Sequence, residues 1–405
     1  MSQDLRVVTL TTALPHAAIE HAGGKYLNLL LEELGPDKVI VIAPPLPSVV
    51  RAVGLPGHPP RTIITRPLPD WLQALESKVR RLDPGMPSWS LLHSLLRDRH
   101  IKAALMGADV IDLQWQDTIR LSRLVRCLAP AAWMVGTFHD VQTQKFRRLA
   151  DRASGLRRLK WRVAERIARR SERVGARLLD TVVVFSDKDR DLLPSNAPAT
   201  VVDPPLAQVG DRQCHAMPDT PTVVFVAFFI RPENHEAAMW LLREVWPLVH
   251  QRVPSAQLSL VGAGSTSELA AETERTAGAC SLGYVDDLDD VLAAASVALV
   301  PLLDGAGVKF KTIEALLAGV PVVTTSIGAE GIQPVDLFWR VTDDTQEFAN
   351  AICEALIHPA EAQAVADEAQ IAATTRYSRS TFSKAVSSVY RVKASRARAT
   401  IESAH

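Results

Sequence analysis

Two lysines follow a glycine-rich turn at residues 304–311. The stretch DGAGVKFKTIE comes after the apolar run VALVPLL and before the helical pattern TIEALLAG. Glycines let backbone amides approach a ligand closely, and a helix N-terminus adds unpaired N–H groups and a positive dipole end. Lys309 and Lys311 alternate, so on an extended backbone both would point to one side and neutralise a diphosphate. The pattern indicates a phosphate-binding turn; the alternative is an ordinary helix start with solvated lysines.

Other groups suited to binding sugars or phosphates stand near predicted strand ends. Glu314 falls in the first predicted helical turn, where its carboxylate can accept hydrogen bonds from sugar or ribose hydroxyls. Gly262 and Gly264 follow an apolar strand and permit a sharp bend, although a plain strand-to-helix turn explains them equally well. Gly23 and Gly24 form an amide-rich turn before a helix, with an ordinary tight turn as the alternative.

A histidine and a basic segment complete the candidates in the first half. His139 ends the strand WMVGTFHD, and we expect it to contact a ligand rather than to be structural, because ligands of such sheets bind at strand ends. Residues 145–177 hold 13 Lys and Arg against three acidic residues. Since we find no clear line of large apolar residues beside these charges, we expect a solvated helix face, with an anionic membrane surface as the alternative. No aromatic platform or recognition motif accompanies them, so nucleic acid is not expected.

The elements that must position these groups alternate between short apolar runs and helical stretches. The runs include LRVVTLTT, KVIVIAP, DTVVVFS, PTVVFVAFF and VPVVTTS, and most are apolar throughout, which is typical of parallel strands covered on both faces. Helical patterns lie at 26–34, 164–179, 234–253 and 312–318. This alternation predicts an α/β protein with doubly wound sheets.

The chain should fold as two domains. Residues 201–222 are rich in proline and polar residues and lack a period. We therefore predict an N-terminal Rossmann-like domain at 1–205, a linker at 206–221 and a C-terminal Rossmann-like domain at 222–375. Residues 376–405 should form a helix with a basic tail that packs back toward the N-terminal domain. Two such sheets place ligands in a cleft where the carboxyl ends of their strands meet.

Composition agrees with a globular protein. The 405 residues are 47% hydrophobic, enough for two or three sizeable cores. No stretch resembles a signal peptide or a membrane span, and the four cysteines are scattered, so we expect a cytoplasmic protein with reduced thiols. The net charge is zero, but residues 1–210 carry 30 basic against 21 acidic residues and the remainder carry the opposite excess. This asymmetry is compatible with one half facing an anionic partner.

The second half of the sequence resembles the family 4 glycosyltransferases, which are retaining enzymes. The resemblance runs through VVFVAFFIRPENHEAAMWLLREVW, then LGYVDDLDDVLAAASVALVPL, and ends in GAGVKFKTIEALLAGVPVVTTSIGAEGI, in order and at compatible spacing. It implies the GT-B architecture, in which two Rossmann-like doubly wound domains face a central cleft. It also implies a nucleotide-sugar donor held mainly by the C-terminal domain.

The resemblance assigns roles to individual positions. Glu314 should bind the ribose, and the backbone around Tyr284 and Val285 should hold the base. The family's glycine loop that approaches the donor phosphate and the acceptor corresponds to Gly23 and Gly24. Residues expected to contact the diphosphate or sugar, or to line the pocket, are Gly262, Gly264, Gly305, Ala306, Gly307, Val308 and Lys309.

Two positions depart from the family pattern. Where many relatives have an upstream glutamate paired with Glu314, this chain offers only Asp304, at a longer separation, and its contact with the donor sugar is left open. Relatives also place an Arg and a Lys after the first strand of the donor domain, whereas here Arg231 has no lysine after it. We expect Lys309 to take over this role, with help from Arg231 and Lys311.

The predicted function is metal-independent transfer of a sugar, with retention, from a UDP- or GDP-sugar to an acceptor hydroxyl. Lys309, Arg231 and His139 are the predicted catalytic residues, without a cofactor or metal site, in the synthesis of a polysaccharide, glycolipid or glycoconjugate. The alternative is a catalytically idle GT-B subunit that binds sugar nucleotide or a partner transferase. An epimerase is less favoured, because its chemistry needs cleft carboxylates. The base, sugar, acceptor and oligomeric state stay open.

Overall fold

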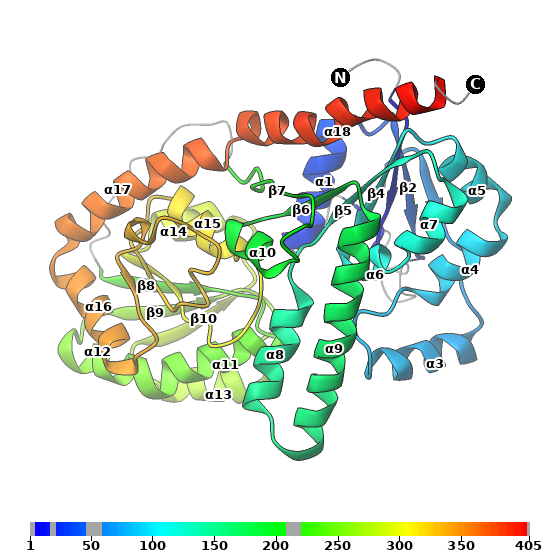
Figure 1. The fold of residues 1–405 in the computed structure, drawn as a ribbon. Helices are drawn as coiled ribbons and strands as arrows, with labels where there is room; N and C mark the ends of the chain where they lie inside the picture. Colours follow the sequence, from blue (N-terminus) through cyan, green and yellow to red (C-terminus); the bar gives the residue numbers. More distant parts are fainter. Residues whose placement is uncertain (1–4, 17–21, 46–58, 208–219, 403–405) are drawn as a thin grey trace. The chain divides into compact units, whose positions relative to one another are not determined.

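The computed structural model describes residues 5–16, 22–45, 59–207 and 220–402 (Figure 1). The chain divides into two units, which are described separately. The N-terminal unit comprises residues 1–204 together with 382–405, and the C-terminal unit comprises residues 205–381. Most of the predicted linker at 206–221 lies outside the described residues.

The described part of the N-terminal unit contains a seven-stranded sheet in the order β3-β2-β1-β4-β5-β6-β7. All neighbouring strands pair in parallel. The chain reverses its direction of winding between β1 and β4, and the carboxyl ends of strands at such a point are where doubly wound sheets bind ligands. The strands are β1 (Val7–Leu10), β2 (Val39–Ala43), β3 (Thr62–Ile64), β4 (Val110–Gln114), β5 (Trp133–Thr137), β6 (Thr181–Val184) and β7 (Ala199–Val201).

Several helices of the N-terminal unit bury apolar side chains in the core of this sheet. Val8, Leu10, Ile111, Leu113 and Met134 are fully buried in its core, as the uninterrupted apolar runs predict. The helices are α1 (Ala22–Leu34), α3 (Asp70–Arg80), α4 (Trp89–Arg97), α5 (Arg99–Met106), α6 (Trp115–Ile119), α7 (Ser122–Leu128), α8 (Gln142–Arg152), α9 (Gly155–Leu178), α10 (Asp187–Leu192) and, from residue 382 onward, α18 (Arg379–Glu402).

The described part of the C-terminal unit contains a second parallel sheet, of six strands, in the order β10-β9-β8-β11-β12-β13. Its winding reverses between β8 and β11. The strands are β8 (Thr222–Val226), β9 (Gln257–Val261), β10 (Ala279–Gly283), β11 (Val297–Val300), β12 (Val322–Thr324) and β13 (Arg340–Val341). The predicted α/β class with doubly wound sheets is confirmed in both units.

The prediction of one continuous α-helix at 234–253 is wrong in one respect, because the helix is interrupted. Residues 241–245 form a π-helical turn between α11 and α12, and Pro247 stands in the first turn of α12. Proline has no N–H to donate, which accounts for the local change of hydrogen bonding. The segments are α11 (Pro232–Trp240), the π turn (Leu241–Val245), α12 (Trp246–Arg252), α13 (Ser267–Arg275), α14 (Leu288–Ala293), α15 (Phe310–Leu317), a 3-10 turn (Val335–Leu337), α16 (Thr345–Ile357) and α17 (Pro359–Arg376).

The last helix, α18, packs on the N-terminal unit through its first turns. Ser383 donates a hydrogen bond to Glu33 of α1 at 2.6 Å, and the rings of Phe382 and Tyr26 meet edge to face. Tyr390, also on α18, is buried. Among the residues that the structure describes, no helix has both the length and the apolar character needed to cross a membrane.

Candidate functional site

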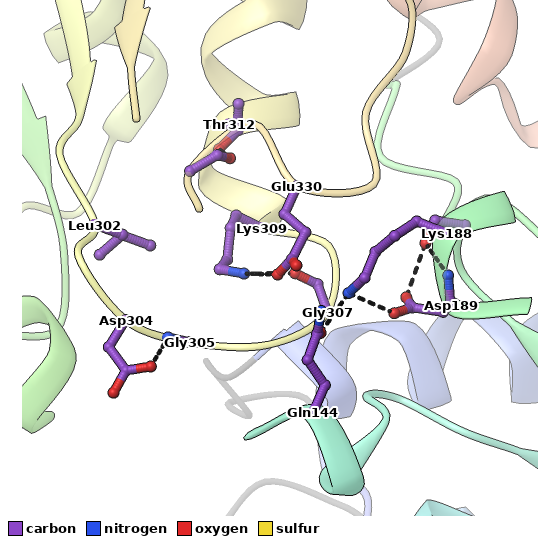
Figure 2. A network of polar contacts seen from close by, with 12 residues as sticks. Gln144, Lys188, Asp189, Leu302, Asp304, Gly305, Gly307, Lys309, Thr312 and Glu330 are labelled. Carbon is purple, nitrogen blue, oxygen red and sulfur yellow. Dashed lines mark hydrogen bonds and ion pairs between the residues drawn. The ribbon is translucent and has the colours of Figure 1, made fainter. Parts of the chain in front are cut away.

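The glycine-rich turn at 304–309 connects β11 to α15, beside the point where the C-terminal sheet reverses its winding. Gly305 has φ +140° and Gly307 has φ +71°, both in the region that L side chains rarely adopt, so both positions require glycine. The Asp304 carboxylate accepts a hydrogen bond from the Gly305 amide at 2.7 Å (Figure 2). A ligand that takes the Gly305 amide must therefore displace the Asp304 side chain.

Lys309 precedes α15 as its N-cap residue. Its ammonium group donates to the Gly307 carbonyl at 2.5 Å and lies 3.5 Å from the Glu330 carboxylate (Figure 2). Both side chains are about nine-tenths buried, with 11% and 8% exposed. Glu330 was not among the predicted site residues, although it belongs to the GAEG sequence of the same quoted stretch. The lysine is thus aimed into the turn and held there by an acid 21 positions further along the chain.

Lys311 differs from the prediction that both lysines alternate on extended backbone. Helix α15 begins at Phe310, so Lys311 stands in the first helical turn and has its own partners. Its ammonium group donates to Asn234 at 2.8 Å and lies over the ring of Phe225, 5.3 Å from the centroid. Burial, together with the charges of Arg231 and Lys309, lowers the pKa of Lys311 to about 7. This lysine can therefore gain charge when an anion arrives.

The loop after β8 contributes Arg231 and Asn234. Arg231 pairs with Glu233 at 2.9 Å while 57% of its side chain stays exposed. Asn234 is buried at the start of α11 and donates to the Phe228 carbonyl at 2.8 Å, which leaves its oxygen to accept from Lys311. Asn234 was not among the predicted site residues, although its place two residues after Pro232 marks a helix start.

Glu314 lies in the second turn of α15 rather than the first, because the helix starts at Phe310, two residues earlier than predicted. Glu314 and Lys311 face a small hollow whose other walls are apolar. The hollow has room for about one water molecule, so it is too small for a nucleotide. The remaining lining residues are Val224, Val226, Leu288, Leu292, Ala298, Leu299, Val300 and Ala315.

The predicted pocket glycines have a structural requirement of their own. Gly262 has φ +130°, and a Cβ atom there would lie 2.0 Å from the Ala227 carbonyl oxygen. Gly264 has φ +83° and lies against Ile230. Backbone close approach at the ends of β8 and β9 therefore explains both glycines without a ligand. Tyr284, just after β10, exposes 60% of its surface.

In the N-terminal unit, His139 follows the end of β5 and is held between aromatic rings. It stacks on Trp115, with centroids 4.2 Å apart and planes within 8°, and Tyr26 and Phe185 meet it edge-on. Its Nε2 lies 2.9 Å from Oε1 of Gln114, the last residue of β4. The ring is thus fixed in position and orientation at the carboxyl end of the sheet.

Gly23 and Gly24 were predicted to form a turn before a helix, but they lie within α1. A Cβ atom on Gly23 would lie 2.9 Å from Nδ1 of His139 and 2.9 Å from the Trp115 ring. Glycine is therefore required here for close packing of α1 against the stacked rings. The sequence gives no sign that these glycines lie next to His139.

Comparison with known proteins supports the resemblance drawn from the sequence. Residues 220–358 match the family model described as "Glycosyl transferases group 1". A Klebsiella pneumoniae protein described as an uncharacterized 44.6 kDa protein in the cps region is 32% identical over 116 residues. That match spans 27% of this chain and 30% of the relative.

Solved structures share the fold of nearly the whole chain. Sucrose-phosphate synthase from Thermosynechococcus elongatus aligns with a TM-score of 0.68 at 16% identity, covering 96% of this chain and 98% of its own. Anabaena HepE in complex with UDP-glucose aligns with a TM-score of 0.62 at 14% identity, covering 95% of this chain and 99% of its own. WaaG, a glycosyltransferase involved in lipopolysaccharide biosynthesis, aligns with a TM-score of 0.63 at 14% identity, covering 95% of this chain and 100% of its own. The predicted resemblance to the group 1 glycosyl transferases is thus confirmed for residues 220–358, and the fold of the chain is the GT-B fold of these enzymes.

Proposed function

We propose that the protein is a retaining glycosyltransferase that moves a sugar from a nucleotide-sugar donor to an acceptor hydroxyl. The observation that carries the proposal is the turn at 304–309. It combines two positive-φ glycines with a buried lysine at a helix start, and it lies inside the segment that matches the group 1 glycosyl transferases. HepE was crystallised with UDP-glucose and with UDP, which makes UDP-sugars the first donors to test.

In this proposal the C-terminal unit stabilises the leaving diphosphate. Negative charge grows on the diphosphate as the glycosidic bond breaks, and preformed cationic groups that meet this charge lower the barrier. Lys309 is positioned for this role, and Lys311 gains its full charge as the anion approaches. Arg231, which is largely exposed, is able to turn from Glu233 toward a phosphate. Glu314 is assigned to the ribose hydroxyls, and Tyr284 with Val285 to the base.

The acceptor oxygen must lose a proton as the new bond forms. In a retaining reaction without an enzyme nucleophile, the acceptor approaches the same face of the sugar from which the phosphate departs. The departing phosphate oxygen takes the proton there. The residues named above hold and neutralise that phosphate, and His139 in the N-terminal unit is assigned to a hydroxyl of the transferred sugar or the acceptor. Metal independence is part of the proposal and is tested by adding EDTA, which should leave the rate unchanged.

The first experiment is calorimetry with UDP, GDP and a panel of their sugars, followed by assays for released nucleoside diphosphate. Binding together with slow release, and a product whose anomeric proton shows the same configuration as the donor, supports the proposal. Tight binding without release from any donor would favour the catalytically idle subunit instead. No binding of any nucleotide sugar would refute both.

We also propose that the hairpin of α8 and α9, residues 142–178, contacts an anionic membrane surface. The expectation of a solvated face rested on the absence of an apolar line, but exposed apolar residues of α9 form such a line. Its members recur at spacings of three, four and seven residues: Leu156, Leu159, Val163, Ile167 and Val174. Leu156 exposes 85% and Leu159 59% of its surface.

The basic residues of this hairpin fall into two groups. Arg147, Arg162 and Arg169 surround the buried carboxylate of Glu165, where they stabilise the hairpin itself. Arg166, Arg170 and Arg173 are exposed beside the apolar line. An exposed apolar line with flanking arginines suits the boundary of an anionic bilayer, where each nearby cation contributes about 1 kcal/mol.

Sedimentation with vesicles of anionic and of neutral lipid tests this contact. The triple variant Arg166→Ala, Arg170→Ala and Arg173→Ala should lose most of its binding to anionic vesicles. The matched control alters Arg97, Arg99 and Arg123, three exposed arginines elsewhere on the N-terminal unit, with the same change of net charge. Equal binding by wild type and the first variant, or equal loss in both variants, would contradict the proposal.

A further inference from the structure

Two buried glutamates of helix α9 contact α8, and their surroundings differ. Glu165 and Glu172 stand seven residues apart, about two helical turns, and expose 5% and 4% of their surface. Three arginines surround Glu165 at distances of 2.6 to 3.1 Å, namely Arg147, Arg162 and Arg169. Burial alone would raise the pKa of Glu165, but the hydrogen bonds and charges of these arginines outweigh burial and lower it. This carboxylate therefore stays ionised at neutral pH.

Glu172 has no such cation beside it. Within the described ranges of the chain it forms no ion pair, and it accepts hydrogen bonds from the Thr143 amide at 3.0 Å and from the Thr143 hydroxyl. Arg120, whose positive charge acts on this carboxyl group from a distance, is paired with Asp83 at 2.6 Å. Asp140, just before α8, adds a negative charge. An ionised Glu172 is therefore a buried charge with hydrogen bonds but without a cation in contact.

The position of Thr143 gives this contact a structural role. The N-cap residue of α8, Val141, has no side-chain oxygen that could accept from the first amides of the helix. Glu172 supplies the missing cap from another helix, because it accepts from the amide of the second residue of α8. One turn further along α9, a Cβ atom on Gly175 would lie 2.6 Å from the Ile119 side chain, so α9 packs closely on the core there. Glu172 thus ties the start of α8 to a firmly packed part of α9.

We propose that Glu172 is a pH-sensitive latch, which holds the start of α8 firmly on α9 while its carboxyl group carries a proton and more weakly once that group is ionised. The protonated group keeps both contacts, because its carbonyl oxygen accepts from the Thr143 amide and its O–H is shared with the Thr143 hydroxyl. The ionised group keeps them as a buried charge, and opening of the α8 start returns that charge to water.

The latch lies close to the candidate ligand end of the N-terminal sheet. Helix α8 begins three residues after His139, which follows the carboxyl end of β5. Opening of the α8 start therefore loosens the segment that follows this histidine. The proposal rests on the contacts of Glu172 alone and not on the proposed function.

The test is hydrogen–deuterium exchange of the full-length protein between pH 5 and pH 8, corrected for the intrinsic exchange rate at each pH. Burial, with the charge of Asp140, raises the pKa of Glu172 to about 7 in the closed form, against 4.5 for an ordinary glutamate. The closed form then binds the proton more tightly, so opening becomes easier as the pH rises from 4.5 to 7 and changes little above that. At residues 142–146 the equilibrium constant for opening should rise roughly fiftyfold between pH 5 and pH 7.5.

Glu172→Gln imitates the protonated side chain, since its amide oxygen accepts from the Thr143 amide and its NH₂ group donates to the hydroxyl. Its opening constant at 142–146 should stay near the wild-type value at pH 5 over the whole range. The matched control is Glu165→Gln, the same substitution at the other buried glutamate of α9, and it should keep the pH-dependent rise.

Three results would overturn the latch. One is a wild-type opening constant that does not change with pH. The second is a rise that persists in Glu172→Gln or disappears equally in both variants. The third is exchange at 142–146 as slow as in strand β4, because the α8 start would then open only when the whole unit unfolds. The first and third are read from the wild-type protein, so a variant that fails to fold does not prevent the test.

Discussion

The lowered pKa of Lys311 predicts that binding of a nucleoside diphosphate takes up a proton. Its pKa in the free protein is about 7, whereas an ordinary lysine has about 10.5. A bound diphosphate favours the charged form and should return the pKa toward its ordinary value. At pH 8 only about a tenth of the free protein carries this proton, so binding should take up about 0.9 proton per molecule. The dissociation constant for UDP should accordingly rise about tenfold per pH unit between pH 8 and 9.

Isothermal titration calorimetry in buffers of different ionisation enthalpy measures this uptake directly. The terminal phosphate of UDP is fully ionised at pH 8, since its second pKa is about 6, and so it adds no proton of its own. Lys311→Met should reduce the uptake to near zero and flatten the pH dependence. Tight binding of UDP with less than about 0.2 proton taken up at pH 8 would show that Lys311 does not meet the diphosphate.

Three further predictions concern single substitutions. Lys309→Ala should raise the barrier to transfer by about 3 kcal/mol, lowering kcat more than a hundredfold, and a loss of only a few-fold would exclude its part in leaving-group stabilisation. Gly262→Ala should lower the free energy of unfolding by at least about 2 kcal/mol more than Gly283→Ala in denaturant titrations, because both have positive φ but only Gly262 would bring Cβ to 2.0 Å from a carbonyl oxygen. Glu172, which accepts hydrogen bonds from the amide and hydroxyl of Thr143, has a pKa raised to about 7 by burial. The ionised Glu172 carboxylate destabilises the folded protein, and this cost is absent below pH 4.5 and complete above pH 7. The free energy of unfolding of Glu172→Gln should therefore rise by about 2–3 kcal/mol relative to that of wild type across this range. A constant difference between the two proteins would contradict this prediction.

The fold was predictable because the signals for it are local. Apolar runs of four or five residues mark strands buried on both faces, and the strands β1, β8 and β11 lie where these runs occur. Helix boundaries were less predictable. Glycine propensity argued against a helix at Gly23 and Gly24, but packing against His139 and Trp115 outweighs it.

The candidate site was predictable where its residues are contiguous, as in the 304–309 turn. Their partners were not, because they come from distant positions. Asn234 meets Lys311 across 77 residues of sequence, and Glu330 reaches Lys309 from beyond β12. The hydrogen bond between Gln114 and His139 joins the ends of two neighbouring strands, and no spacing along the chain indicates it.

The apolar line on α9 illustrates the opposite case, in which the signal was present but missed. Leu156, Leu159, Val163 and Ile167 recur at helical spacing, but arginines stand between them in the sequence. Only the orientation of the helix, which buries Ala164 and Ala168 on the other side, shows that this line is exposed.

The most direct test of diphosphate binding by the C-terminal unit is a crystal structure of the full-length protein with UDP, or with GDP if calorimetry favours it. We expect the diphosphate within hydrogen-bonding distance of the amides at 305–307 and of the Lys309 ammonium group, with the Glu330 carboxylate displaced from that lysine. A nucleotide bound elsewhere, with the turn empty and the pair of Lys309 and Glu330 intact, would contradict the proposed role of this turn.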